Sequence, residues 1–358
     1  MKTIRNLILT LVPIALVACG GGSQPAPSAS APSSSEEKKL NLFCWSEYIP
    51  QNVIDGFTQE TGIKVAVENY SSNEEMLSKL LAGGGKYDLI QPSEYTIQAL
   101  IKADQLHPLN QAALPNFVHI APEFRNMTYD AGNKFSVPYM AGFVGICVNT
   151  DKVKTPVKGF ADVFTPAHKG RIVVLDDARE IVSWALEADK LGLNSVNPEN
   201  LKKIEPLLKK WLPLVKVYDS DSPKTSLKNG DVDLGVIWSG EAALLYQENK
   251  KFAFVLPSEG SHLFVDNLAI PKTSTHPQNA HLFINYILRP EVSKLISDAF
   301  PYYNPNLAAR KLLSPEQLAN PASYPPAEDI TRLETFTDLG KESASVDELV
   351  TQIKAGGK

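Results

Sequence analysis

Acidic and aromatic side chains recur together at several points along this chain, each time beside a short apolar run. The clusters are Trp45, Ser46, Glu47 and Tyr48; Ser93, Glu94 and Tyr95; Asp176, Asp177 and Glu180; Trp238, Ser239 and Glu241; and Phe264 and Asp266. An aromatic face attracts an ammonium group by roughly 0.5 to 2 kcal/mol and also covers methylene groups, while carboxylates pair with charged ends. A neutral sugar would need fewer carboxylates, and an anion would need arginines or helix N-termini free of acids. The clusters therefore favour a linear polyamine as the ligand.

The same residue types also have ordinary structural roles, which the sequence leaves open. Asp177 and Glu180 have the spacing of a helix N-cap and its N3 partner. The aromatic residues Trp45, Trp238 and Phe264 are equally suited to a hydrophobic core. Among the glutamates, we expect solvation rather than ligand binding for Glu47, Glu94 and Glu241.

Alternating strand and helix patterns surround these clusters. Strands are predicted at residues 40–44, 64–67, 87–90, 171–175 and 234–238. The intervening helices include one that stops before Gly62, one that opens with the capping-box spacing of Ser72 and Glu75, and one that runs through Trp184 to Leu191. This alternation is typical of parallel α/β sheets, whose ligands bind beyond the carboxyl ends of the strands. The clusters stand at those ends.

The first residues have the layout of an export signal. Lys2 and Arg5 precede an apolar run from Leu7 to Val17 that is too short to span a bilayer. The run ends at Cys19 in a lipobox, which predicts a lipoprotein signal peptide at residues 1–18 and lipidation of Cys19. Residues 19–38 are rich in Gly, Ser, Pro and Ala and are predicted to form a flexible tether. We therefore expect a periplasmic protein that is lipid-anchored to a membrane.

The remaining chain from Leu40 holds about 320 residues, more than one core usually supports, so two lobes are expected. The net charge is −5, and it falls to about −7 if Lys2 and Arg5 leave with the signal, which disfavours nucleic acid as a partner.

Cys44 and Cys147 lack the spacing of a metal motif. They are expected to be buried thiols, although the compartment also allows a disulfide.

Seven stretches of the chain resemble the polyamine-binding proteins of bacterial spermidine and putrescine transporters. They are "CWSEYIP", "ETGIKV", "YDLIQPSEY", "LDDARE", "VIWSGEA", "DNLAIP" and "NPNLAARKLLSPE". The resemblance implies a two-lobed periplasmic binding protein fold of type II, in which each lobe is a mostly parallel sheet flanked by helices and a hinged cleft lies between them. By this resemblance lobe 1 holds residues 39–146 and 261–312, and lobe 2 holds 147–260 and 313–358.

The resemblance also implies which residues bind the amine. These are Trp45, Ser46, Tyr48, Ser93, Tyr95, Asp177, Glu180, Trp238, Phe264, Asp266 and Tyr302. It further implies a monomer that binds without catalysis, cofactor or metal and delivers its polyamine to the membrane permease of an ABC transporter. Phe264 and Phe336 depart from the spermidine members towards putrescine, whereas Tyr95 and Asp177 match those members. The expected ligand is spermidine, with putrescine also bound.

Two other functions are considered beside polyamine transport. The adjacent phenols Tyr302 and Tyr303, with Glu47, resemble the ligands of periplasmic ferric-iron carriers. A lipid-anchored hydrolase could use Asp177 and Asp266 as paired carboxylates, but the chain has no G-x-S-x-G or H-E-x-x-H signature. The histidines are expected to lie away from the clusters; they are His107, His119, His168, His262, His276 and His281.

Overall fold

The computed structural model describes residues 36–83 and 86–356 of the chain. The predicted signal peptide, Cys19 and nearly all of the predicted tether lie outside these residues. The tether's last residues lie inside them, and both carboxylate oxygens of Glu36 accept hydrogen bonds from backbone amides at the start of α9 (Pro277–Ile287). No helix in the described part of the chain is long and apolar enough to cross a membrane.

The first third of the chain alternates strands and helices as predicted. The elements are β1 (Lys39–Trp45), α1 (Gln51–Thr61), β2 (Lys64–Tyr70), α2 (Asn73–Leu81), β3 (Leu89–Ile90) and α3 (Glu94–Lys102). Strand β1 pairs in parallel with both β2 and β3. Helix α1 ends where predicted because Gly62 adopts a left-handed conformation with φ of 74°. The parallel pairing directs the carboxyl ends of the three strands to the same edge.

A second set of alternating elements follows the long strand β4 (Ser136–Asn149). Its strands and longer helices are β5 (Ile172–Val174), α5 (Ala178–Ala188), α6 (Pro198–Trp211), β6 (Val215–Tyr218), α7 (Lys224–Lys228), β7 (Leu234–Trp238), α8 (Ser239–Glu248) and β8 (Phe252–Val255). Strand β5 pairs in parallel with β6 and β7. Strand β6 was not predicted, and α5 ends three residues before Leu191.

The chain then returns through β9 (Ser261–Ala269) and ends in helices. The remaining strands and helices are α4 (Phe160–Val163), α9, α10 (Pro290–Ala299), α11 (Leu307–Arg310), α12 (Pro315–Leu318), α13 (Ala327–Ile330), β10 (Leu333–Glu334) and α14 (Ser343–Gly356). The 3₁₀ turns are Gln111–Ala113, Pro115–His119, Pro122–Phe124, Pro166–His168, Leu212–Leu214 and Gly340–Glu342.

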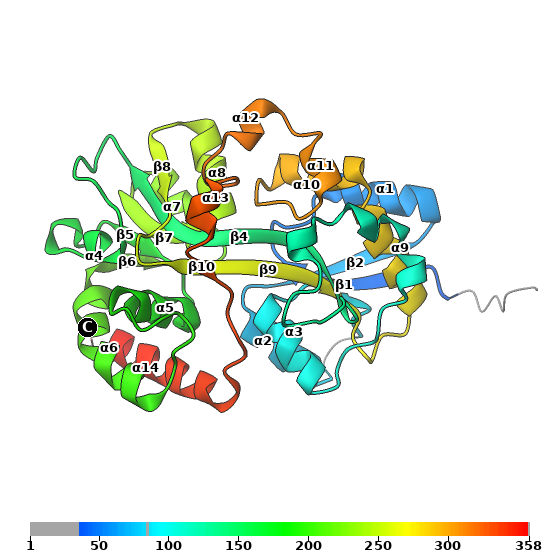
Figure 1. The fold of residues 1–358 in the computed structure, drawn as a ribbon, viewed down its shortest axis with the longest axis horizontal. Helices are drawn as coiled ribbons and strands as arrows, with labels where there is room; N and C mark the ends of the chain where they lie inside the picture. The colour runs from blue at the N-terminus through cyan, green and yellow to red at the C-terminus, as the bar shows by residue number, and fades with distance from the viewer. Residues whose placement is uncertain (1–35, 84–85, 357–358) are drawn as a thin grey trace, which may run out of the picture. The chain divides into compact units, whose positions relative to one another are not determined.

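Strands β4 and β9 pair antiparallel and connect the two sets of elements (Figure 1). The sheet order is β2-β1-β3-β9-β4-β7-β5-β6, with β10 beside β9 and β8 beside β4. One hydrophobic core contains Leu42, Phe57 and Phe283, and another contains Val174 and Trp184. We call the part built on β1–β3 the first lobe and the part built on β5–β7 the second lobe. The predicted α/β class is confirmed.

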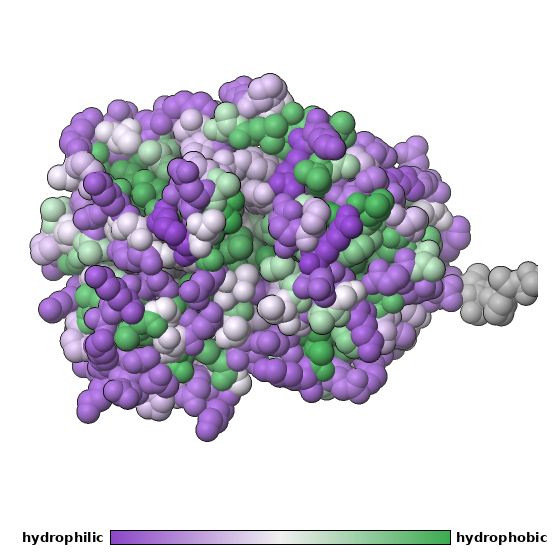
Figure 2. Space-filling view, viewed as in Figure 1, coloured by the Kyte–Doolittle hydropathy of each residue, from purple (hydrophilic) through white to green (hydrophobic). Residues whose placement is uncertain are grey.

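The face of the molecule drawn in Figure 2 carries its hydrophobic side chains in small groups. On the face drawn in Figure 2, hydrophilic residues dominate and the hydrophobic ones are scattered among them.

Inside the fold, Cys44 and Cys147 are both buried, free thiols, and burial raises the pKa of each to about 12. The expectation of two buried thiols is therefore confirmed.

Candidate ligand-binding pocket

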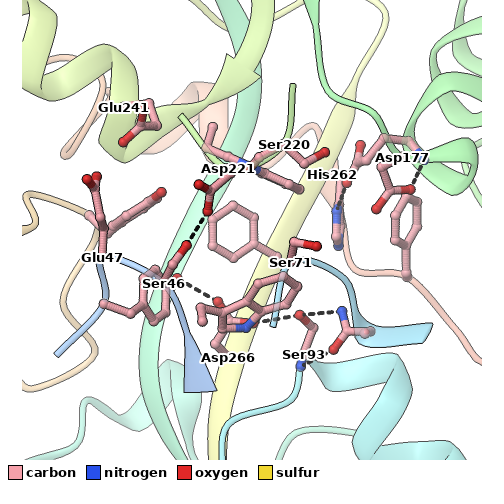
Figure 3. A pocket seen from close by; sticks show the side chains of 18 of the residues that line it. Ser46, Glu47, Ser71, Ser93, Asp177, Ser220, Asp221, Glu241, His262 and Asp266 are labelled. Carbon is pink, nitrogen blue, oxygen red and sulfur yellow. Dashed lines mark hydrogen bonds and ion pairs between the residues drawn. The ribbon is translucent and has the colours of Figure 1, made fainter. Parts of the chain in front are cut away.

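The residues predicted to bind the ligand all line one pocket, whose empty space of about 700 Å³ includes open solvent (Figure 3). They are Trp45, Ser46, Tyr48, Ser93, Tyr95, Asp177, Glu180, Trp238, Phe264, Asp266 and Tyr302. They come together because most of them follow β1, β3, β5 and β7, whose carboxyl ends face the pocket, while Phe264 and Asp266 lie on β9. Other members of the clusters lie elsewhere: Asp176 pairs with Lys354 on the surface, and Ser239 accepts a hydrogen bond from the Phe143 amide.

Eight further residues line the pocket: Glu47, Ser71, Asn73, Ser220, Asp221, Glu241, His262 and Phe336. The sequence analysis missed Ser71, Asn73, Ser220 and Asp221, expected Glu47 and Glu241 to be solvated, and named Phe336 only for its bearing on ligand preference. Ser71 follows β2, and Ser220 and Asp221 follow β6, so the strand-end rule would have found them had those strand ends been recognised. The expected placement of His262 away from the clusters is wrong.

Asp266 lies on β9 in the wall of the pocket with 3% of its surface exposed. Ser93 Oγ donates to its Oδ1 at 2.6 Å, and the Tyr48 hydroxyl donates to its Oδ2 at 2.6 Å. Burial raises the pKa of Asp266 to about 7, and these hydrogen bonds oppose the shift. The carboxylate is therefore held in place by neutral donors and forms no ion pair with any residue in the described part of the chain.

Asp177 serves as the N-cap of α5, as its spacing predicted, and it also lines the pocket. Its Oδ1 accepts a hydrogen bond from the Glu180 amide at 3.0 Å. Burial, together with the nearby carboxylates of Glu74 and Glu180, raises the pKa of Asp177 to about 7. A cation in the pocket would favour the charged form of Asp177 and lower this pKa.

His262 lies between two glutamates that come from different lobes. Its Nδ1 is 2.6 Å from Glu180 Oε1 on α5, and its Nε2 is 3.0 Å from Glu94 Oε1 on α3. The ring stacks on Phe336 with centroids 3.7 Å apart. Burial alone lowers the pKa of His262, but the two carboxylates outweigh it and raise the pKa to about 9. The imidazole is therefore a cation at neutral pH that bridges the lobes.

Two of the glutamates that were expected to be solvated are buried, so that expectation is wrong for them. Glu94 is fully buried, where its carboxylate also accepts hydrogen bonds from the backbone amides of Val265 and Phe336. Glu241 is 6% exposed and lines the pocket. Glu47 is exposed as expected, but it also lines the pocket.

Glu47 and Glu241 lie together at one end of the pocket, and Asp177 and His262 lie at the other (Figure 3). Lys224 Nζ is 2.7 Å from Glu47 Oε2 and 2.9 Å from Glu241 Oε1. Close by, Ser46 Oγ donates a hydrogen bond to Asp221 Oδ1. The two lobes are thus joined at this end by an ion pair and a hydrogen bond.

Aromatic rings form the walls between the two acidic ends. Trp238 meets Phe264 edge to face at 5.5 Å, and Tyr302 meets both Phe264 at 5.9 Å and Tyr48 at 5.3 Å. Tyr302 can lie this deep because a Cβ atom at Gly240 would overlap its ring. Burial holds the pKa of Tyr48 and of Tyr302 well above the usual range, so both phenols stay neutral.

The structure also places the residues of the two alternative sites. Tyr302 lines the pocket, whereas the Tyr303 hydroxyl lies elsewhere and accepts a hydrogen bond from Arg310 Nη1 at 2.6 Å. The paired phenolates that a ferric-iron carrier needs are therefore not brought together. Asp177 and Asp266 do line the same pocket, where Asp177 accepts a hydrogen bond from the Glu180 amide and Asp266 accepts one from Ser93 Oγ.

Comparison with known proteins identifies the family of this chain. The family model for bacterial extracellular solute-binding proteins matches residues 52–326. A spermidine/putrescine-binding periplasmic protein of Salmonella typhimurium is 38% identical over 332 residues, which cover 91% of this chain and 94% of that protein. This chain belongs to the bacterial extracellular solute-binding protein family.

Solved structures of family members share its fold. A Listeria monocytogenes chain has a TM-score of 0.86 at 32% identity, covering 89% of this chain and 99% of its own. The spermidine/putrescine ABC transporter substrate-binding protein of Streptococcus pneumoniae has a TM-score of 0.77 at 35% identity, covering 90% of this chain and all of its own. The two-lobed periplasmic binding protein fold is confirmed by these likenesses, and the curated relative's periplasmic location supports an extracytoplasmic location here. The residue boundaries of the lobes stay a prediction.

Proposed function

We propose that this chain is a solute-binding protein that captures a polyamine outside the cytoplasm and delivers it to the membrane permease of an ABC transporter. The observation that carries this proposal is a set of pocket carboxylates without a cationic partner in the described residues: Asp177, Asp221 and Asp266. Binding involves no chemical change, so the protein is not an enzyme and needs neither cofactor nor metal. The eleven residues predicted from the sequence form the ligand site.

The electrostatics of the pocket support a cationic ligand. A buried carboxylate without a counter-ion is unfavourable, which is why burial raises the pKa of Asp266 and Asp177. Glu180 Oε2 is also buried and accepts no hydrogen bond from the described residues. An ammonium group supplies both the charge and the N–H donors that these oxygens lack. The aromatic walls between the acids suit the methylene segments of the same ligand.

The number of uncommitted carboxylates supports spermidine as the preferred ligand, with putrescine also bound. Glu180 is already paired with His262 through Oε1, so only its Oε2 is left to accept a hydrogen bond, and Glu47 and Glu241 are both paired with Lys224. Asp177, Asp221 and Asp266 then match the three ammonium groups of a triamine, whereas a diamine satisfies only two. Tyr95, one of the features that match spermidine-binding members, lies beside Phe336 with ring centroids 5.9 Å apart.

We also propose that Cys19 carries a lipid anchor and that residues 19–38 tether the domain to the membrane as a monomer. The basic start, apolar run and cysteine of the sequence support the anchor. The face drawn in Figure 2 is mainly hydrophilic, and such a face does not suit a lasting self-association, which usually buries a larger apolar patch. The lobes, at the boundaries predicted from the sequence, would close on the amine and present the closed form to the permease.

The proposal is tested by isothermal titration of the full chain in detergent with spermidine, putrescine, lysine and ferric citrate. We expect binding of micromolar affinity or tighter for the two polyamines, tighter for spermidine, and none for lysine or ferric citrate. Absence of heat with both polyamines would remove the proposed function. Tighter binding of putrescine would remove only the spermidine preference.

A further inference from the structure

Lys224 supplies a cation to the acidic end of the pocket from inside the protein. Its ammonium group contacts both oxygens of Glu241 at 2.9 and 3.0 Å, Glu47 Oε2 at 2.7 Å and Ser222 Oγ at 3.2 Å. A lysine has three N–H donors, so these three acceptor groups use all of them. The group is thus fully coordinated by the protein, as a bound ammonium ligand would be.

The two carboxylates that hold Lys224 also line the ligand pocket. Glu241 is nearly buried, and burial raises its pKa while Lys224 opposes that rise. The side chain of Glu47 is 55% exposed and reaches Lys224 from the first lobe. Without Lys224 these two acids would face each other across the end of the pocket with no counter-ion among the described residues, an arrangement that favours an external ammonium group.

The local chain fixes Lys224 in this place. Asp219, at the end of β6, accepts hydrogen bonds from the amides of Asp221 and Ser222 at 2.9 and 3.0 Å. This turn directs Asp221 into the pocket and starts α7, whose first residue is Lys224. The backbone position of Lys224 therefore follows from a short, internally bonded segment, and its side chain is only 20% exposed.

We propose that Lys224 acts as a resident ammonium group that closes one end of the polyamine site and limits how many ammonium groups a ligand can place there. The inference rests on the proposed function and deepens it. Because Lys224 is paired with both Glu47 and Glu241, the pocket carboxylates without a cationic partner among the described residues are Asp177, Asp221 and Asp266. A tetramine such as spermine has one ammonium group more than these three acids, and to pair that group at the Glu47 and Glu241 end of the pocket it would have to displace Lys224.

The test compares Lys224→Met with Lys228→Met in the full chain. Both changes remove one positive charge from α7, but Lys228 pairs with Glu248 on the surface, at 2.7 Å with both side chains more than half exposed. Titration with putrescine, spermidine and spermine gives the ratio of spermine to spermidine affinity for each variant. We expect Lys224→Met to raise this ratio about tenfold or more and Lys228→Met to leave it within twofold of wild type.

Two results would overturn the inference. One is an unchanged ratio in Lys224→Met, and the other is an equal loss of affinity for all amines, which would assign Lys224 to lobe closure alone. If Lys224→Met does not fold, Lys224→Gln retains hydrogen bonding to both glutamates and carries the same expectation. Wild-type protein that binds no amine would remove the proposed function and this inference together, whereas wild-type binding of spermidine with an unchanged variant ratio removes this inference alone.

Discussion

Ser46 donates a hydrogen bond to Asp221 across the mouth of the pocket, although 175 residues separate them in the sequence. Ser46 follows β1 in the first lobe, and Asp221 follows β6, at the far edge of the second lobe's part of the sheet. The sheet order places several strands between β1 and β6, so this contact bridges the two lobes. If the lobes close on the amine as proposed, this contact marks the closed form.

Replacing Ser46 with alanine should speed release of the amine. A hydrogen bond of this kind contributes about 0.5 to 1.5 kcal/mol, so we expect the release rate to rise about two- to tenfold. Stopped-flow fluorescence of the pocket tryptophans Trp45 and Trp238 measures the rate. Ser258→Ala, which removes a surface hydroxyl bonded to its neighbour Glu259, is the control. Equal release rates in both variants would show that the contact does not hold the closed form.

Replacing Asp266 with asparagine should weaken spermidine binding at least about tenfold, or about 1.4 kcal/mol. The change keeps the size of the side chain but removes the charge that a desolvated ammonium group would pair with. Titration calorimetry measures the affinity, and Asp104→Asn, on an exposed side chain paired with Lys272, is the control. Unchanged affinity in Asp266→Asn would remove this residue from the ligand site.

Amine affinity should fall as the pH is lowered from 8 to 6. In the free protein the pKa of Asp266 and of Asp177 is raised to about 7, so each carboxyl gains a proton across this range. A bound ammonium group requires the charged form, and the proton must leave on binding. Below pH 7 the affinity should drop by up to about tenfold per pH unit for each carboxyl.

Proton release gives this prediction a second measurement. Titrations at pH 6.5 in buffers of different ionisation enthalpy should show protons released as spermidine binds. The variant Asp266→Asn should release fewer. A binding heat that does not depend on the buffer would contradict the assignment of these two carboxyls. His262 stays charged over the same range, because its pKa is raised to about 9.

Replacing His262 with glutamine should destabilise the fold by about 3 to 5 kcal/mol, because it leaves buried carboxylates without their shared cation. The pKa of His262 rises from 6.5 in the unfolded chain to about 9 in the fold. Its stabilising effect is therefore fully present below about pH 6.5 and is lost as the pH rises through about 9. Urea unfolding should show a larger difference between wild type and variant at pH 6.5 than at pH 9.5. The exposed His107→Gln is the control, and a difference that does not change with pH would contradict a charged His262.

Strands and helices with a clear local pattern could be predicted from the sequence. The aromatic and acidic pocket residues that directly follow the predicted strands could be predicted with them. Asp177 is an example. Its three-residue spacing from Glu180 predicts the N-cap of α5, and its place shortly after an apolar run predicts the end of a strand. His262 could not be found in this way. Its partners lie 82 and 168 residues away in the sequence, and only the pairing of β9 with the rest of the sheet brings them to it.

Lys224 was missed for a more local reason. It follows β6, a strand of four residues with an alternating Val-Lys-Val-Tyr pattern that directly succeeds a 3₁₀ turn. Nothing in so short a pattern separates a strand from an irregular connection. Its ionic partner Glu47 also comes from the other end of the sheet, which no local spacing reports.

Strand β9 contributes His262, Phe264 and Asp266 to the pocket from every second position. Side chains of a strand alternate between its two faces, so a single-residue insertion or deletion between positions 262 and 266 would turn part of this set away from the ligand. Substitutions leave the alternation intact. Within this strand, ligand preference can therefore diversify by exchanging residue types but not by changing length.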